Sequence, residues 1–377
     1  ELAGRAFGVV LVKINGQAFE VATFRKDGPY SDGRRPDWVE YSDAASDVKR
    51  RDFTINGMLY NPGRDELIDM VGGRADLEAG IIRCIGNPDE RFGEDYLRLM
   101  RCVRFAARLS FRIEDNTCRT LKHRAACISR VAVERICDEL IRIIVGPNRG
   151  SGLRLLHNSG LLKEILPEVA NLDGIEQSPE HHPEGDAFEH TCRVLDEILN
   201  PDDVLAFAAL LHDIGKKDTQ ISAADRIHFH GHAEKSAEMA RDVCRRLRIS
   251  GAKSETICSL VANHMRFKDF PQMGRAAKLR LFSLPEFEKL LELHRADRMA
   301  SSRRLDNYEA ALSEYNSLSR AEREPEPLIN GHELLAAGFT AGPLIGDILN
   351  EVRNRQLEGE LLTREDALIF VEGKFRK

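Results

Sequence analysis

EDYLRLMRCVRF, residues 94–105, carries the strongest structural and chemical signal in this chain. A carboxylate pair is followed by arginines at steps of three and four residues, which predicts a helix that displays them on one face. These residues are Glu94, Asp95, Arg98, Arg101, Arg104, Arg108 and Arg112. Forked guanidinium groups hold triphosphates well, and a carboxylate beside a guanidinium can read the donor and acceptor edge of a base. The alternative is a solvated helix face with one weak ion pair.

The charge of the chain is unevenly distributed. The net charge of the 377 residues is −6, which argues against a globally basic nucleic-acid binder. Residues 98–154 nevertheless contain 13 Lys or Arg and only 5 Asp or Glu. This asymmetry favours one basic surface that meets a polyanion, and a dipole without a partner is the alternative.

Cysteine usage and hydropathy indicate a cytoplasmic protein without membrane contact. The eight cysteines include no C-x-x-C pair and no short metal-binding spacing, as is typical of reduced thiols. No stretch approaches the roughly 20 apolar residues that a membrane span requires.

The pattern of residues predicts an α+β fold in four parts. An Asn15-Gly16 turn between apolar runs predicts a β-hairpin within residues 7–25, and after Pro88 almost every segment has helical periodicity. We expect a β-sheet head over 1–88, a helical neck over 89–175, a body over 176–318 and a helical tail over 319–377.

KRRDFTIN, residues 49–56, is a second candidate site. Arginine neutralises phosphates, and Asp52 and Asn56, four residues apart on an expected helix face, can fix a loop or a ribose hydroxyl. A purely structural helix start is the alternative.

Four motifs in order, RRDFTIN (50–56), DMVGG (69–73), EDYLR (94–98) and VERICDEL (133–140), resemble those of the class II tRNA nucleotidyltransferases. This family comprises the CCA-adding enzymes and the related bacterial poly(A) polymerases, and the resemblance covers nearly the whole chain. It implies a polymerase-β-like nucleotidyltransferase head and the addition of CCA, or of the terminal A, to tRNA from CTP and ATP with a protein template.

The resemblance also implies residue roles. Asp95 and Arg98 match the pair that reads the base, and Glu94 matches a residue that buttresses it. Three arginines match residues that hold the base or the triphosphate, namely Arg51, Arg101 and Arg104.

Glu20 resembles the third acidic position of the family's Mg²⁺ site, although an outward strand glutamate is an equal alternative. The family's D-x-D pair is expected upstream of Glu1. On that expectation the 377-residue chain binds nucleotide without catalysing its addition.

Two segments bear on the type of addition. Gly4-Arg5-Ala6-Phe7 lacks the two successive basic residues expected of poly(A) polymerases, and DGPYSDGRRPDWV (27–39) fills the loop that CC-only enzymes lack. Full CCA or terminal A addition is therefore favoured over poly(A) addition.

The C-terminal half carries histidines and aspartates of a kind that bind metal. In order they are His190, His212, Asp213, His232, His264 and Asp297. Imidazole and carboxylate groups on separate helices can converge on a divalent or transition metal. The set resembles the HD phosphohydrolase superfamily and implies a phosphatase or 2′,3′-cyclic phosphodiesterase, with Lys216 as a candidate phosphate contact.

Residues 326–371 predict two amphipathic helices around Gly338 and Gly342-Pro343. They resemble the family's tRNA-binding end, and a helical cap is the alternative. Two further interpretations of the chain remain open: an HD phosphohydrolase whose incomplete head only binds RNA, and a nonenzymatic RNA-binding scaffold.

Overall fold

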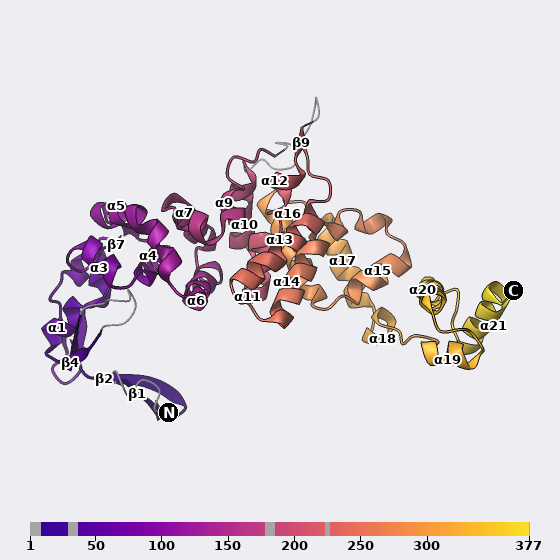
Figure 1. The fold of residues 1–377 in the computed structure, drawn as a ribbon, viewed down its shortest axis with the longest axis horizontal. Helices are drawn as coiled ribbons and strands as arrows, with labels where there is room; N and C mark the ends of the chain where they lie inside the picture. The colour runs from indigo at the N-terminus through magenta and orange to yellow at the C-terminus, as the bar shows by residue number, and fades with distance from the viewer. Residues whose placement is uncertain (1–8, 29–36, 178–184, 223–226, 377) are drawn as a thin grey trace.

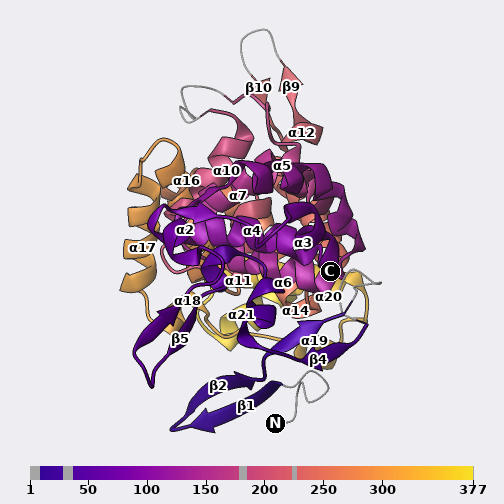
Figure 2. The same ribbon diagram turned by 90° about the vertical axis from the view of Figure 1, so that its left-hand side faces the viewer.

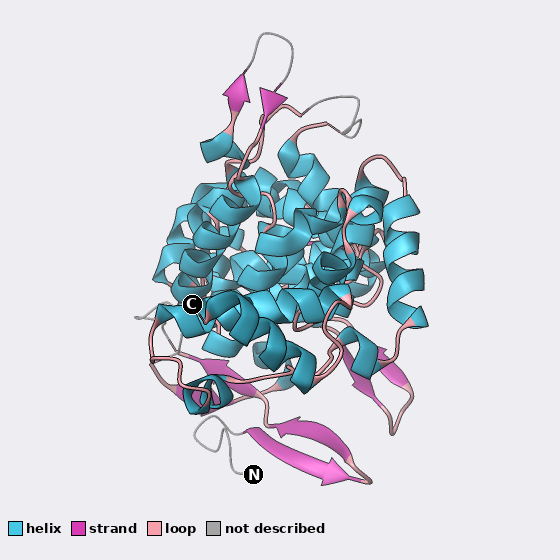
Figure 3. Ribbon diagram, turned by 90° about the vertical axis from the view of Figure 1, so that its right-hand side faces the viewer, coloured by secondary structure: helices cyan, strands magenta, loops and turns pink. Residues whose placement is uncertain are grey.

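Helices make up most of the chain, and strands occur only as short pairs (Figures 1 and 3). A computed structural model describes residues 9–28, 37–177, 185–222 and 227–376. Within these ranges each sheet has two strands, so the α+β class is confirmed, with a smaller β component in the head than the predicted sheet. Head, neck, body and tail follow one another along the long axis, so that the tail lies at the opposite end from the head (Figure 1).

The head begins with the predicted hairpin. Asn15 and Gly16 both have positive φ, 50° and 80°, as a tight two-residue turn between twisted strands requires. The hairpin projects from the rest of the head (Figure 2). The head elements are β1 Val9–Ile14, β2 Gln17–Ala22, β3 Arg25–Asp27, β4 Val39–Tyr41, α1 Ala44–Lys49, a 3-10 helix Thr54–Asn56, β5 Leu59–Asn61, β6 Glu66–Ile68, α2 Gly73–Glu78 and β7 Ile81–Ile82. The segments 4–7 and 29–36, used above to judge the type of addition, lie outside the described residues.

Asp52 and Asn56 do not share a helix face, so that prediction was wrong. The chain leaves α1 at Arg50, and the fully buried Phe53 forms an isolated antiparallel bridge with Cys84. The Asp52 carboxylate accepts the Phe53 N–H at 2.9 Å, which stabilises this extended path. The two side chains still meet, because the Asn56 amide donates to Asp52 at 3.0 Å.

The arginine-rich stretch forms two helices, not one. Helix α3, Pro88–Glu94, ends before Asp95, whose backbone is extended at φ −148° and ψ 105°. Helix α4, Leu97–Leu109, follows and stops at Ser110, which has φ 57°. Arg112 therefore leaves the stripe: it lies in β8, Arg112–Ile113, and pairs in parallel with Ile81 of β7. The predicted single helix was wrong at both ends.

Neck and body share one apolar core. Leu99, Leu140 and Leu153 of the neck and Leu195 and Leu210 of the body are fully buried in the same cluster. Its burial is the main stabilising contribution to this part of the fold. The remaining neck elements are α5 Asp115–Arg124, a 3-10 helix Ala125–Arg130, α6 Val133–Ile144, α7 Arg149–Asn158, α8 Leu161–Ile165 and α9 Pro167–Ala170.

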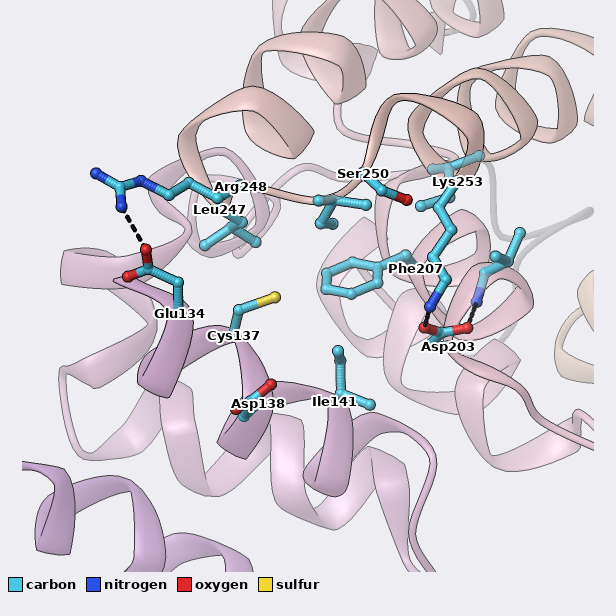
Figure 4. Close-up of a pocket in the computed structure, with 13 residues that line it drawn as sticks. Glu134, Cys137, Asp138, Ile141, Asp203, Phe207, Leu247, Arg248, Ser250 and Lys253 are labelled. Atoms are coloured by element: carbon cyan, nitrogen blue, oxygen red, sulfur yellow. Dashed lines mark hydrogen bonds and ion pairs between the residues drawn. The ribbon is translucent and has the colours of Figure 1, made fainter. Parts of the chain in front are cut away.

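The body is a cluster of helices around the predicted histidine and aspartate ligands. Its elements are α10 Ala187–Glu197, α11 Asp203–Leu211, α12 Lys216–Thr219, β9 Ile221–Ser222, β10 Ile227–His228, α13 His232–Arg246, α14 Gly251–Asn263, 3-10 helices His264–Phe267 and Phe270–Gln272, α15 Arg275–Phe282, α16 Phe287–Ala300 and α17 Asp306–Ser317. A cavity of about 270 Å³ separates one face of α6 from α11 and the α13–α14 connection (Figure 4). Cys137, Phe207 and Leu247 line it, and an ion pair between Glu134 and Arg248 spans one side.

The tail has a small core of its own, built around Leu334, Ile348 and Val371. Three helices, not two, supply this core, because α21 follows the two helices that flank Gly338 and Gly342-Pro343. The tail elements are α18 Arg320–Arg323, α19 Gly331–Ala336, α20 Pro343–Glu358 and α21 Arg364–Phe375. Across the described ranges, no helix is both long enough and apolar enough to span a membrane. All eight cysteines are free thiols.

Candidate functional site

A pocket of about 450 Å³ lies where the head meets the neck. Its lining residues come from the segment after α1, from the α3–α4 junction and from α6: Arg50, Arg51, Asp52, Asn56, Asp95, Leu97, Arg98, Arg101, Phe105 and Arg135. Six of the eight predicted nucleotide-binding residues are among them. The structure thus brings two motifs that are nearly 40 residues apart to one cavity, and four arginines besides Arg98 give it a cationic wall.

Asp52 anchors this wall. Its carboxylate accepts hydrogen bonds from the Arg101 guanidinium, with Nε–Oδ2 at 2.7 Å, and from Asn56. Burial alone would raise the pKa of Asp52, but Arg101, Asn56 and the Phe53 N–H outweigh it and lower the pKa below its ordinary value. Asp52 is therefore ionised at neutral pH and fixes Arg101 at the edge of the pocket.

Arg98 is held rigidly by three acceptors. Its Nη1 donates to the backbone oxygen of Arg91 at 2.9 Å and to the Glu94 carboxylate, and its Nη2 donates to the backbone oxygen of Arg50 at 3.0 Å. A guanidinium has five N–H donors, so Nε–H and one Nη2–H are left without a partner among the described residues. Glu94 thus contacts Arg98, and its role as a buttress of the template stays a prediction.

Asp95 is held by a residue that the motif comparison left without a role. Arg135 of α6 donates to both oxygens of the Asp95 carboxylate, Nη1 to Oδ1 at 3.2 Å and Nη2 to Oδ2 at 2.8 Å. The Leu97 N–H also donates to Oδ1 at 3.1 Å. Arg135 belongs to VERICDEL, and this motif was the signal in the sequence that could have identified it.

Two predicted residues, Glu94 and Arg104, lie apart from the pocket lining. Arg104 is buried behind it, with Nε 2.6 Å from Glu139 Oε2 and its guanidinium 4.3 Å from the centre of the Phe105 ring. Arg104 therefore supports Phe105 from behind. Arg51 does line the pocket, where Asp47 and the backbone oxygen of Asn56 hold its guanidinium.

Glu20 lies on the exposed hairpin strand β2, opposite Leu11 of β1. Within the described residues, no other carboxylate or histidine joins it in a group that could hold a metal ion. The metal-binding role of Glu20 stays a prediction, and the described residues alone do not form a site for Mg²⁺ in the head.

The body brings all six predicted HD residues together. Two groups each present three ligand atoms within 4.8 Å of one another, namely His190, His212 and Asp297, and Asp213, His232 and His264. Asp213 lies between the groups, with Oδ2 at 3.1 Å from His212 Nε2 and Oδ1 at 3.5 Å from His232 Nε2. They come from α10, the α11–α12 connection, α13, the end of α14 and α16.

Three of these histidines are oriented as metal ligands. His212, His232 and His264 each place Nδ1 2.7–2.8 Å from the carbonyl oxygen three residues earlier, those of Ala209, Phe229 and Val261. An Nδ1–H that donates to a carbonyl leaves Nε2 as the free lone pair, which is the usual arrangement of a histidine bound to metal. The Nε2 atom of His212 is buried and accepts no hydrogen bond from the described residues.

The electrostatics of the cluster fit a cation. Burial lowers the pKa of His264 to about 3, so its imidazole is neutral and able to ligate. Burial alone would raise the pKa of Asp213, but His212 and Lys216 hold it well below its ordinary value. Lys216 Nζ lies 2.7 Å from Asp213 Oδ2 and places a positive charge at the rim of the cluster. Anionic and neutral donors in this number match the ligands that divalent metals take.

Comparison with known proteins agrees with this geometry. Residues 1–83 match the family model "Poly A polymerase head domain", residues 110–172 match "Probable RNA and SrmB-binding site of polymerase A" and residues 187–311 match "HD domain". The chain is 34% identical to the A-adding tRNA nucleotidyltransferase of Deinococcus radiodurans over 86% of this chain and 78% of that protein.

The chain belongs to the tRNA nucleotidyltransferase family. This nucleotidyltransferase is also 30% identical to the CCA-adding enzyme of Ligilactobacillus salivarius, over 97% of this chain and 81% of that protein. Its fold resembles the crystal structure of the Bacillus stearothermophilus CCA-adding enzyme in complex with CTP, with a TM-score of 0.72 and 24% identity over 100% of this chain and 84% of that chain. The predicted family is thus confirmed.

Proposed function

We propose that this tRNA nucleotidyltransferase selects CTP and ATP in the 450 Å³ pocket and adds them to the 3′ end of tRNA, as CCA or as the terminal A. The observation that carries the proposal is the pair formed by Asp95 and Arg98 on one wall of the pocket. One member only accepts hydrogen bonds, and the other only donates them.

The hydrogen-bonding edges of the four bases explain the choice. Cytosine and adenine both present an exocyclic amino donor beside a ring nitrogen that accepts. The amino group donates to Asp95, and the ring nitrogen accepts from Arg98. Uracil and guanine present a carbonyl oxygen beside a ring N–H, so each would place an acceptor against the carboxylate and a donor against the guanidinium. The pocket therefore favours CTP and ATP with the same two side chains.

The remaining arginines suit the triphosphate. Arg50, Arg51 and Arg101 line the same pocket, and Asp47 and Asp52 keep their guanidinium groups in place. Charge-assisted hydrogen bonds from such groups neutralise phosphate oxygens. Nucleotidyl transfer calls for a divalent metal, here Mg²⁺, which when bound would supply Lewis-acid activation of the attacking 3′-hydroxyl and charge neutralisation of the pyrophosphate. No step is assigned to Glu20, because the described residues around it offer no second ligand.

The proposal is tested with labelled CTP and ATP and three tRNA substrates: one lacking CCA, one lacking only the terminal A, and one complete. Incorporation of both nucleotides into the first substrate indicates CCA addition, and labelling of the second alone by ATP indicates A addition. Long A tails on unrelated RNA would instead support the poly(A) polymerase alternative. No incorporation and no binding of CTP or ATP would refute the proposal.

We also propose that the body is a metal-dependent phosphohydrolase that acts on phosphorylated or cyclic RNA 3′ ends. The buried group of six ligands with oriented imidazoles supports this second function. A divalent metal held by these six residues would lower the pKa of a water molecule and so supply the nucleophile for phosphoester hydrolysis. Lys216, whose Nζ lies 2.7 Å from Asp213 Oδ2, is the candidate phosphate contact.

Metal analysis and hydrolysis of a 2′,3′-cyclic nucleotide test this second function. His212→Ala and Asp213→Ala should lose metal and activity, whereas His230→Ala, an exposed residue outside both ligand groups, should keep both. A metal-free protein, or hydrolysis that survives the first two substitutions, would rule the second function out.

A further inference from the structure

VERICDEL, residues 133–140, is a family-like motif to which no function has been assigned above. It forms the first two turns of α6, Val133–Ile144, which packs beside α4. Two of its side chains reach the nucleotide pocket region: Arg135 contacts Asp95, and Glu139 contacts Arg104. The motif is therefore joined to Asp95 and to Arg104, which precede their partners by 40 and 35 residues.

We propose that Arg135 is a positioning residue that sets base specificity by fixing the carboxylate of Asp95. This inference rests on the proposed function of the pocket and deepens it. Arg135 acts through Asp95: it orients the carboxylate and limits the number of donors that the carboxylate can still accept.

Counting acceptor positions shows how. A carboxylate offers about four lone-pair positions, two on each oxygen. On Asp95, Oδ1 already accepts the Leu97 N–H and Arg135 Nη1, and Oδ2 accepts Arg135 Nη2. Within the described residues, one position remains, on Oδ2. A single amino hydrogen of cytosine or adenine fills it.

Loss of Arg135 changes this count. The carboxylate would then keep only the Leu97 N–H and would have three open positions, with free rotation of its side chain. The Asp95 carboxylate could then rotate and accept a hydrogen bond from the ring N–H of uracil or guanine. In its fixed orientation it cannot do so, because that N–H lies opposite Arg98. Discrimination between amino-bearing and carbonyl-bearing bases should fall, while phosphate contacts made by the other arginines remain.

The helix that carries Arg135 is well fixed. Ile136 and Leu140 of α6 lie in the main core, and Glu139 forms the buried pair with Arg104 at 2.6 Å. Glu134 immediately precedes Arg135, and its side chain extends to Arg248 at the cavity between neck and body (Figure 4). Adjacent residues on α6 thus serve different parts of the molecule, and Glu134 provides a matched control.

The Arg135–Asp95 pair is not a main support of the fold. The side chains are 25% and 16% exposed, and ion pairs in contact with solvent contribute little to stability. Arg135→Ala should therefore fold, with an unfolding temperature close to that of Glu134→Gln. Its effect should appear in specificity.

Equilibrium binding of CTP, ATP, UTP and GTP to the full chain tests the inference in the parent, Arg135→Ala, Arg135→Lys and Glu134→Gln. We expect the parent and Glu134→Gln to prefer CTP and ATP, and Arg135→Ala to lose at least tenfold of that preference. Arg135→Lys should be intermediate, because an ammonium group keeps the charge but cannot fork across both carboxylate oxygens.

The outcomes separate the two proposals. A parent chain without preference for CTP and ATP would refute the proposed function of the pocket. If the parent is selective and Arg135→Ala is equally selective, only the proposed role of Arg135 is overturned. The same holds if Arg135→Ala binds all four nucleotides more weakly by the same factor. Should Arg135→Ala fail to fold, Arg135→Lys decides in the same way, since full selectivity in that variant contradicts the need for a forked donor.

Discussion

The buried pair between Arg104 and Glu139 gives a sharp prediction for stability. The side chains are only 9% and 4% exposed, with Nε–Oε2 at 2.6 Å. Glu139→Gln keeps the shape but removes the negative charge, so the Arg104 guanidinium stays buried without a counter-ion. Breaking such a pair from one side costs about 3–5 kcal/mol. The exposed pair of Glu134 with Arg248, at 53% and 67% exposure, should cost less than about 1 kcal/mol when Glu134→Gln removes it.

Hydrogen exchange of the α4 and α6 amides is the appropriate assay, because a chain with several parts does not unfold in one step. A loss of about 3 kcal/mol speeds exchange roughly a hundredfold, since about 1.4 kcal/mol corresponds to a factor of ten. Glu134→Gln should change it less than about tenfold. The double variant Arg104→Met/Glu139→Met should recover most of the loss, because it leaves no unpaired charge. Equal acceleration in Glu139→Gln and Glu134→Gln would refute the reasoning.

Three further predictions concern acid stability, metal and helix packing. Because the pKa of Asp52 is lowered, its ionised form stabilises the fold at pH values above the ordinary pKa near 3.8. This contribution is lost as the pH falls through the lowered pKa. The difference in stability between the parent and Asp52→Asn, measured by circular dichroism, should therefore disappear in acid. Removing metal with a chelator should lower the unfolding temperature of the parent, because the folded state loses the free energy of metal binding, about 2.7 kcal/mol at a hundredfold excess of metal over Kd. The unfolding temperature of His212→Ala should not change. A Cβ at Gly150 of α7 would lie 2.5 Å from a carbonyl oxygen of α10, so Gly150→Ala should cost about 1–3 kcal/mol in urea unfolding, whereas Gly346→Ala, with no atom within 4 Å, should cost nothing.

Local chemistry made part of this fold readable from the sequence. Asn15-Gly16 specified its hairpin because both residues tolerate positive φ. The helical body and the order of its ligand residues were also evident, since each ligand type sits at a helix end or on a helix face. The structure places the six side chains together as expected, and their role as metal ligands stays a prediction.

Tertiary contacts explain what the sequence did not predict. Periodicity suggested an unbroken helix through Asp95, but the Asp95 side chain bonds the Leu97 N–H and starts a new helix. Asp52 and Asn56 were expected on a helix, but the burial of Phe53 against Cys84 draws the chain into an extended path. Arg135 meets Asp95 only because α6 folds back beside α4, and no local spacing encodes a contact across 40 residues.

The uninterrupted core that joins neck and body also limits how the two proposed activities work together. Leu99 and Leu210 are packed in one cluster, so the proposed template and the proposed HD ligands lie in separate parts of one continuous core. An RNA 3′ end seated beside Asp95 therefore has to be released before the body can act on it. Extension and end repair would then compete for free RNA ends, and the outcome would depend on how fast each site lets its RNA go.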